Sequence, residues 1–180
     1  MSTLKSPVSE QDHVQGPATA KITLVEYGDY ECPHCATAYP IAKRVEKHYG
    51  NDLRFVFRNF PLNQIHPYAE SAAESAEFAA AHGKFWQMHD ALFENQDRLG
   101  DDLYAELAQQ LGLNPGDLAQ ALSDGTYTAH VRSDFSGGVR SGVNGTPTFF
   151  INGIRHDDSF DYETLVAAIE AALQSAPAKP

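Results

Sequence analysis

Short apolar stretches in the first third of the chain have the pattern of β-strands. Residues 21–27 and 53–59 are short runs rich in β-branched and aromatic side chains, as expected for strands. Between them, residues 33–49 carry apolar side chains at helical spacing. Strand, helix and strand in this order predict a parallel βαβ unit.

The middle of the chain, from residue 67 to residue 142, has the pattern of consecutive helices. Apolar positions recur at helical spacing, and glycine, proline and asparagine residues separate the segments. The predicted helices cover residues 68–82, 85–96, 103–111, 115–122 and 126–142. This block is too long to be a simple connection between two strands, so we interpret it as a helical insertion.

Two short apolar runs near the C-terminal end, residues 148–151 and 154–155, flank the pair Asn152-Gly153. Asn-Gly between two such runs is the strongest short signal for a β-hairpin. A final helix is predicted over residues 162–174, which place an apolar stripe on one helical face. The chain therefore ends in a ββα unit.

The order of elements, βαβ, a helical block and ββα, predicts an α/β fold. The simplest arrangement is a four-stranded sheet with helices on its faces and one helical insertion. We expect a flexible N-terminal arm at residues 1–19, which are rich in Ser, Pro, Gln and Gly. Residues 20–65 and 143–175 would form a discontinuous α/β domain, and residues 66–142 the inserted helical domain.

Charge and hydropathy exclude several classes of function. The chain has 24 acidic and 13 basic residues and a formal net charge of −11, so nucleic acid is a poor candidate for a partner. The sequence has no apolar run long enough to span a bilayer. Its first twenty residues are polar and lack the apolar segment of a secretion signal. As written, the chain is therefore expected in the cytoplasm, or in the periplasm or another extracytoplasmic space if a leader was removed.

The candidate chemistry lies at the start of the helix at 33–49, where the sequence reads Cys32-Pro33-His34-Cys35. These are the only two cysteines in the chain. Proline is suited to the first helical position, and unpaired N–H groups at a helix N-terminus favour the thiolate form of a neighbouring cysteine. His34 adds a donor or a positive charge. We therefore expect Cys32 to be the nucleophile and Cys35 the resolving cysteine.

Two structural explanations of the cysteine pair are weaker. A disulfide that closes so short a loop constrains the unfolded chain little. A structural zinc site needs about four ligands, and the sequence has no second pair with metal-binding spacing. The pattern favours a redox pair, which needs no metal or organic cofactor because the electrons of disulfide exchange reside on sulfur.

With these features the chain resembles the DsbA-like family of thioredoxin-fold proteins. The resemblance rests on Val25-Glu26-Tyr27 before the cysteine pair and on the later sequence Gly-Thr-Pro-Thr-Phe at 145–149. It extends over residues 12–174, and also includes the stretch His-Gly-Lys-Phe-Trp at 82–86. Cys-x-x-Cys alone is moderately specific, and the combination is strong.

The resemblance implies that the Thr146-Pro147 bond is cis and that this loop faces the cysteine pair. Gly145, Thr146 and Pro147 would then dock an extended substrate that pairs like an added strand. From the residues alone, Pro147 could equally begin a strand in the trans form. The resemblance also makes Glu26 a buried acid that carries the proton of Cys35.

Strand alternation alone places Glu26 on the same face as Ile22 and Leu24, where a carboxylate is expensive to bury. A salt bridge to Arg58 on the neighbouring strand is the alternative to a catalytic role. Asp29 and Glu31, beside the motif, are expected to be exposed and to oppose a thiolate on Cys32 only weakly, because solvent screens them. Histidines elsewhere, at 66, 82 and 89, are interpreted as surface or packing residues.

The sequence gives two opposing indications of the direction of electron flow. Pro33-His34 is the dipeptide of strongly oxidising family members, which favours a protein disulfide oxidase. Thr146 is more typical of disulfide reductases and isomerases, so a cytoplasmic reductase or isomerase is the main alternative. A kappa-type glutathione transferase, or a peptide-binding module without catalysis, is favoured less. Protein or peptide thiols and disulfides are the expected partners, together with a redox partner that resets the pair.

Overall fold

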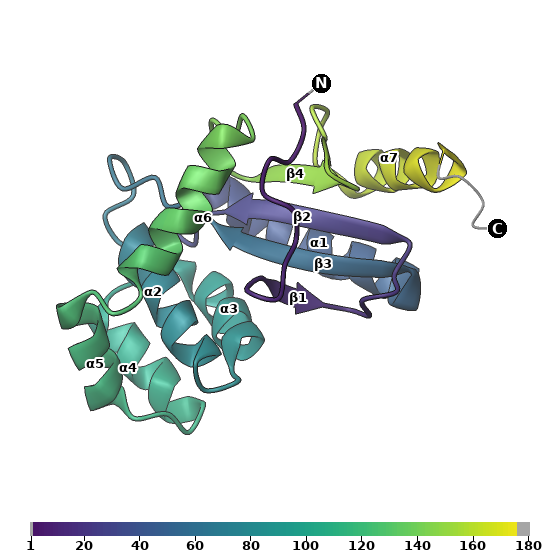
Figure 1. The fold of residues 1–180 in the computed structure, drawn as a ribbon. Helices are drawn as coiled ribbons and strands as arrows, with labels where there is room; N and C mark the ends of the chain where they lie inside the picture. The colour runs from purple at the N-terminus through teal and green to yellow at the C-terminus, as the bar shows by residue number, and fades with distance from the viewer. Residues whose placement is uncertain (1, 176–180) are drawn as a thin grey trace.

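The structure is a computed structural model that describes residues 2–175 of the chain. Its centre is a mixed five-stranded sheet with the order β1-β3-β2-β4-β5 (Figure 1). The strands are β1 (His13–Gln15), β2 (Ile22–Gly28), β3 (Leu53–Asn59), β4 (Thr148–Ile151) and β5 (Ile154–Arg155). β2 and β3 are parallel, and the other neighbouring pairs are antiparallel.

Within residues 2–175, seven α-helices surround the sheet. They are α1 (Pro33–Tyr49), α2 (Ala69–Ala80), α3 (Phe85–Glu94), α4 (Asp101–Gln110), α5 (Pro115–Asp124), α6 (Thr128–Arg140) and α7 (Tyr162–Ser175). Helices α1 and α7 cover one face of the sheet, and α2 to α5 gather at one end of it (Figure 1). None of the helices in this described part of the chain is both long and apolar enough to cross a membrane.

The alternation of side chains along β2 divides the core in two. Ile22 and Leu24 belong to the larger apolar cluster, which includes residues of α1, α7 and the helical insertion. Val25 and Tyr27 point to the other face and pack in a smaller cluster with Phe150. A strand between two covered faces is normally apolar on both sides. The buried Glu26 is the exception within β2.

The predicted α/β architecture with a helical insertion is confirmed. α1, β3 and the two hairpin strands β4 and β5 begin and end at the predicted residues, and the other predicted elements differ by one to a few residues at their ends. Such differences are normal for helix and strand termini.

The prediction of a flexible N-terminal arm at residues 1–19 is wrong for the described part of that range. β1 pairs with the free edge of β3, which gives the sheet five strands instead of four. Further towards the N-terminus, the Leu4 amide donates to the Gly153 carbonyl at 2.8 Å, and Thr3 bridges to Ile154 on β5. The segment thus crosses the sheet and contacts both of its edges (Figure 1).

Arg58 explains why this polar segment is ordered. Its side chain is 4% exposed, and a buried guanidinium needs acceptors for its N–H groups. Nε and Nη2 donate to both carboxylate oxygens of Asp12, at 2.7 and 3.0 Å, and Nη1 donates to the Ser6 carbonyl at 2.8 Å. The N-terminal segment therefore supplies the counter-charge for a buried residue of β3.

Candidate active site

The cysteine pair lies where β2 leads into α1, as predicted. Cys32 is the N-cap of α1, with extended backbone angles (φ −71°, ψ 122°), and Pro33 takes the first helical turn. Cys32 and Cys35 are free thiols and are 4% and 0% exposed. Gln96, from the helical insertion, donates its amide to the Cys32 carbonyl at 2.9 Å and so holds the turn in place.

Cys32 has the electrostatic environment of a stable thiolate. The pKa of its thiol is lowered to about 5, chiefly by a hydrogen bond from the Cys35 thiol, which outweighs the opposing effect of burial. The Thr146 side chain and the backbone N–H groups of Cys35 and His34 lower it further. His34 thus acts here through its backbone at the helix N-terminus, whereas its imidazole is exposed.

Cys35 has the opposite environment. Burial raises the pKa of its thiol well above the ordinary value, and the Cys32 sulfur and the Glu26 carboxylate raise it further. The backbone N–H of Asp29 donates to Cys35 Sγ at 3.4 Å but offsets little of this shift. At neutral pH the reduced pair therefore holds one thiolate, on Cys32, and one proton, on Cys35.

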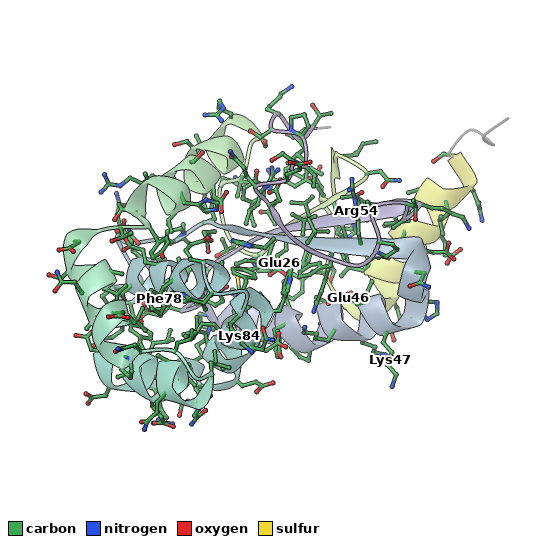
Figure 2. The ribbon with its side chains drawn as sticks, turned by 60° about the horizontal axis from the view of Figure 1, so that its bottom comes forward. Glu26, Glu46, Lys47, Arg54, Phe78 and Lys84 are labelled. Carbon is green, nitrogen blue, oxygen red and sulfur yellow. The ribbon has the colours of Figure 1, made fainter. Side chains whose placement is uncertain are left out.

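Glu26 is buried beneath this pair, between the sheet and the helix that carries Glu46 (Figure 2). Its pKa is raised to about 8, mainly by burial and then by the Glu46 carboxylate and the Cys32 sulfur. Among the described residues, Glu26 Oε1 has no hydrogen-bond partner. An unpartnered buried carboxyl that titrates near neutral pH can hold and release a proton inside the molecule.

The alternative role for Glu26, a salt bridge to Arg58, is wrong. In the register of β2 and β3, Glu26 lies opposite Phe57, and Tyr27 lies opposite Arg58. Arg58 therefore points to the other face of the sheet, where it bonds Asp12 and the Tyr27 hydroxyl. The sequence reveals which face Glu26 shares, but the strand register decides its partner.

The Thr146-Pro147 loop faces the cysteine pair from the start of β4. The Thr146-Pro147 peptide bond is cis, and the Thr146 carbonyl oxygen lies 3.4 Å from Cys32 Sγ, where it accepts a hydrogen bond when the thiol is protonated. The Thr146 hydroxyl is buried and has no hydrogen-bond partner among residues 2–175. It is therefore available to donate to the Cys32 thiolate. Gly145 lies next to this contact, and its carbonyl accepts from the Thr148 hydroxyl at 2.7 Å.

Asp29 differs from its predicted position: it is 1% exposed instead of solvent-exposed. Its carboxylate accepts from the backbone N–H groups of Glu31 and Leu62 at 2.8 and 2.9 Å, and from His66 Nδ1 at 2.8 Å. These bonds spread its charge and tie the loop after β3 to the cysteine turn. Sequence reasoning missed His66 because nothing local in the sequence links it to Asp29.

His66 is half-buried near the site and is charged more readily than an ordinary histidine. Burial alone would lower its pKa, but the Asp29 carboxylate and, more weakly, the Cys32 sulfur raise it. Glu46 is the other residue that sequence reasoning missed, and burial raises its pKa to about 7. No local signal marks it, because its position relative to Glu26 depends on how α1 packs on the sheet.

The sequence family described as Thioredoxin matches residues 8–171, most of the chain. In structure, the chain superposes on BdbD from Bacillus subtilis with a TM-score of 0.87 and 25% identity, over 97% of this chain and 99% of that one. This chain belongs to the DsbA-like family of thioredoxin-fold proteins. Its DsbA-like fold and its Cys-x-x-Cys pair support a thiol–disulfide oxidoreductase.

Two more distant structures share the DsbA-like fold. Wolbachia pipientis alpha-DsbA1 is 20% identical, with a TM-score of 0.81 over 95% of this chain and 94% of that one. The catalytic domain of Proteus mirabilis ScsC is 18% identical, with a TM-score of 0.78 over 93% and 92%. At these identities the similarity establishes the fold alone.

Curated relatives of this DsbA-like chain are longer proteins. It is 41% identical over 171 residues to the Na(+)/H(+) antiporter NhaA 3 of Salinispora tropica, a match that covers 95% of this chain and 26% of the relative. It is 43% identical over 176 residues to the Na(+)/H(+) antiporter NhaA 1 of Mycobacterium sp. (strain KMS), over 94% and 28%. The chain thus spans about a quarter of the length of these relatives.

A pH titration of Cys32 and Cys35 in the reduced protein tests the protonation states assigned to the two thiols. We expect the reduced protein to show one thiolate transition near pH 5, because the lowered pKa belongs to Cys32 alone. Ultraviolet thiolate absorbance, read against the oxidised protein, measures it. The Cys32→Ser variant should lose the transition, and Cys35→Ala should move it to higher pH by removing the main hydrogen bond. An apparent pKa above 8 in the wild-type protein would contradict the assignment.

Proposed function

We propose that this protein is a disulfide donor that oxidises pairs of cysteines in protein or peptide substrates. The observation that carries the proposal is the asymmetry of the cysteine pair: the pKa of Cys32 is lowered to about 5, and that of Cys35 is raised well above its ordinary value. A stabilised thiolate on Cys32 favours the reduced pair over the disulfide. The oxidised pair therefore tends to pass its disulfide to a substrate.

The first step of the proposed reaction forms a mixed disulfide. A substrate thiolate attacks Cys32 Sγ, the Cys32–Cys35 bond breaks, and the electron pair leaves on Cys35 Sγ. Because the Cys35 thiolate is disfavoured in its buried position, it takes up a proton at once. Glu26, whose pKa is raised to about 8, is protonated at neutral pH and is the candidate donor.

The second step releases the product. The other substrate thiol, once deprotonated, attacks the substrate sulfur of the mixed disulfide, and Cys32 leaves as a thiolate. Two electrons have then passed from the substrate to the pair. Glu26 takes up a proton from solvent again, so of the two substrate protons one is accounted for on Cys35 and one remains in solvent. The low pKa of Cys32 makes it a good leaving group in this step.

The lowered pKa of Cys32 also gives an upper limit for the free energy that drives the transfer of the disulfide to a substrate. Lowering a thiol pKa from 9 to about 5 stabilises the folded, reduced protein at pH 7 by at most about 2.7 kcal/mol. Solvent at the mouth of the site screens part of this energy. The upper limit corresponds to about 60 mV in the potential of a two-electron couple, in the oxidising direction.

In this proposal, substrates dock along the Thr146-Pro147 loop. The Thr146 carbonyl lies 3.4 Å from Cys32 Sγ, so an extended peptide that pairs with this backbone places its cysteine next to the reactive sulfur. Pairing through backbone groups depends little on the side chains of the substrate and therefore on its sequence. This suits an enzyme that oxidises many different polypeptides.

We place the reaction outside the reducing cytoplasm, which is the alternative of the two locations expected from sequence. A strong disulfide donor among cytoplasmic thiols would remain reduced. In support, the chain shares its fold with a periplasmic thioredoxin-like protein from Salmonella enterica serovar Typhimurium. The donor then requires a partner that re-oxidises the pair after each turnover, and that partner is part of the proposal.

The reduction potential of the Cys32–Cys35 pair tests the direction of the reaction. We expect a value of roughly −120 to −150 mV from equilibration in glutathione buffers, because the Cys32 thiolate stabilises the reduced form. Trapping the free thiols with acid and an alkylating reagent gives the ratio of the two forms. A value near roughly −230 to −270 mV would instead indicate a reductase or isomerase and overturn the proposed direction.

A further inference from the structure

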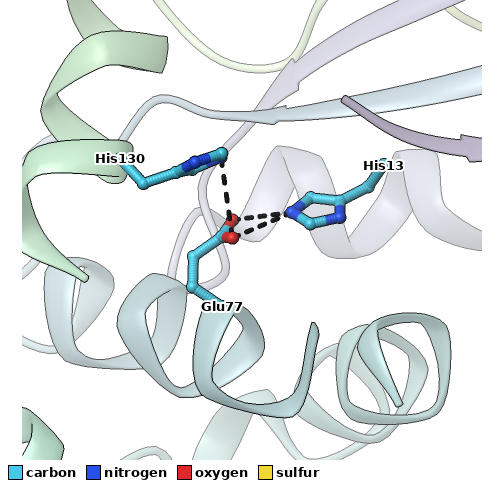
Figure 3. A group of neighbouring side chains, drawn as sticks. All are labelled: His13, Glu77 and His130. Atoms are coloured by element: carbon cyan, nitrogen blue, oxygen red, sulfur yellow. Dashed lines mark hydrogen bonds and ion pairs between the residues drawn. The ribbon is translucent and has the colours of Figure 1, made fainter. Parts of the chain in front are cut away.

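A second cluster of reactive side chains lies where the N-terminal segment meets α2 and α6 (Figure 3). His13 of β1, Glu77 of α2 and His130 of α6 each offer one ligand atom, and these atoms lie within 4.8 Å of one another. His13 Nε2 is 2.9 Å from both carboxylate oxygens of Glu77, and His130 Nε2 is 3.6 Å from Glu77 Oε2. Neither cysteine belongs to this cluster.

We propose that His13, Glu77 and His130 bind one divalent transition-metal ion of the zinc class. Two imidazole nitrogens and one carboxylate oxygen form a donor set that suits zinc and its neighbours in the first transition series. Calcium and magnesium prefer sites made only of oxygen ligands. Ligand bonds of about 2.0–2.2 Å to a tetrahedral ion place the donor atoms a little over 3 Å apart, close to the shorter separations present here.

The charge of Glu77 supports a cation at this position. Its side chain is 4% exposed, and among the described residues its ion-pair partners are His13 and His130, with no lysine or arginine. A buried carboxylate is costly without a compensating positive charge. A metal ion supplies that charge and leaves both histidines neutral, which is the form in which imidazole binds metals.

The cluster is oriented by its surroundings, as the ligands of metal sites generally are. The His13 ring stacks on Phe85, with centroids 3.6 Å apart and planes at 11°. Asn59 Nδ2 donates to Glu77 Oε1 at 2.7 Å and so fixes the rotation of the carboxylate. These contacts orient two of the ligands and leave His13 Nε2 and Glu77 Oε2 available to the ion.

The remaining coordination position has a candidate ligand and a path to solvent. Asp134, one turn after His130 on α6, brings Oδ2 to 3.8 Å from His130 Nε2. Either this carboxylate or a water molecule can complete four-fold coordination. The His130 side chain is 35% exposed, so an ion can enter from the surface while Glu77 stays buried.

A metal ion here would connect three parts of the chain that are distant in sequence: the N-terminal segment, α2 and α6. Its role would be structural, because zinc has no redox chemistry of its own and the proposed disulfide exchange needs no metal. Sequence reasoning predicts no metal site because positions 13, 77 and 130 form no local spacing motif.

Cobalt binding to the full chain carrying Cys32→Ser and Cys35→Ser tests the proposal. The serines remove the competing thiolates, so the result does not depend on the redox function. We expect one equivalent of Co²⁺ to give the visible d–d bands of a tetrahedral nitrogen–oxygen site, and Zn²⁺ to displace it. Zn²⁺ should also raise the melting temperature, because a ligand that binds only the folded state stabilises it.

Two ligand variants and one control complete the test. His130→Gln, at a half-exposed position, and Glu77→Gln, which keeps the side-chain shape, should each weaken Co²⁺ binding by at least about tenfold. His82→Gln, at an exposed histidine outside the cluster, should leave binding unchanged. Circular dichroism verifies that each variant is folded. Absence of stoichiometric binding, or binding that both ligand variants retain, would overturn the proposal.

Discussion

Replacing Cys32 by serine is expected to reduce disulfide exchange to the uncatalysed rate. The reaction needs a sulfur at this position twice, first as the site of attack and then as a thiolate leaving group. Serine cannot form the disulfide, and its hydroxyl does not ionise at neutral pH. The formation of disulfides in a reduced protein substrate, followed by loss of free thiols, measures the effect.

Replacing Cys35 by alanine is the matched control, because it removes the resolving sulfur and keeps the nucleophile. This variant should accumulate a mixed disulfide between Cys32 and a substrate cysteine, which non-reducing electrophoresis and mass spectrometry detect. If Cys32→Ser still exchanged disulfides, the assignment of the nucleophile would be wrong. If both variants bound extended peptides and the wild-type protein exchanged none, the protein would be a binding module.

Replacing Glu26 by glutamine is expected to stabilise the reduced protein at pH 7 by about 3 kcal/mol. The carboxyl pKa is 4.5 when exposed and about 8 in the folded protein, so folding favours the protonated form. Below pH 4.5 the carboxyl is neutral in both states and the two proteins should be equally stable. Between about pH 4.5 and 8 the unfolded state loses its proton first, so the wild-type protein loses about 1.4 kcal/mol per pH unit relative to the variant.

Urea unfolding of both reduced proteins across this pH range measures the difference. Glu10→Gln, at an exposed position, is the matched control for the removal of one surface carboxyl group. A pH-independent difference for Glu26→Gln would show that Glu26 is not a buried titrating group. The same variant tests proton transfer: an unchanged exchange rate from about pH 5 to 8 would remove the proposed role of Glu26 as proton donor.

Local patterns in the sequence predict the elements that carry the cysteines. The helix at Pro33–Tyr49 and the strand at Leu53–Asn59 follow from apolar spacing and from proline at a helix start. Cys32 follows as the N-cap, and with it the sulfur beside the helix N-terminus. These features depend on a few neighbouring residues, so local reasoning reaches them.

Partners that are distant in the chain could not be predicted in this way. The Asp12–Arg58 and Asp29–His66 pairs each join residues whose relation depends on strand register and on the path of a loop. A polar N-terminal segment looks dispensable when its only visible property is composition. The buried arginine that it neutralises belongs to another strand, and nothing near Asp12 in sequence indicates it.

The path of the N-terminal segment determines how the chain can be shortened. One stretch of residues supplies β1 to one edge of the sheet and bridges Ile154 at the other. A version beginning at residue 20, the domain border suggested by composition, would expose both edges at once and leave Arg58 without its carboxylate. Unpaired sheet edges recruit strands from other molecules, so removing this segment would turn a sheet with two covered edges into a template for aggregation.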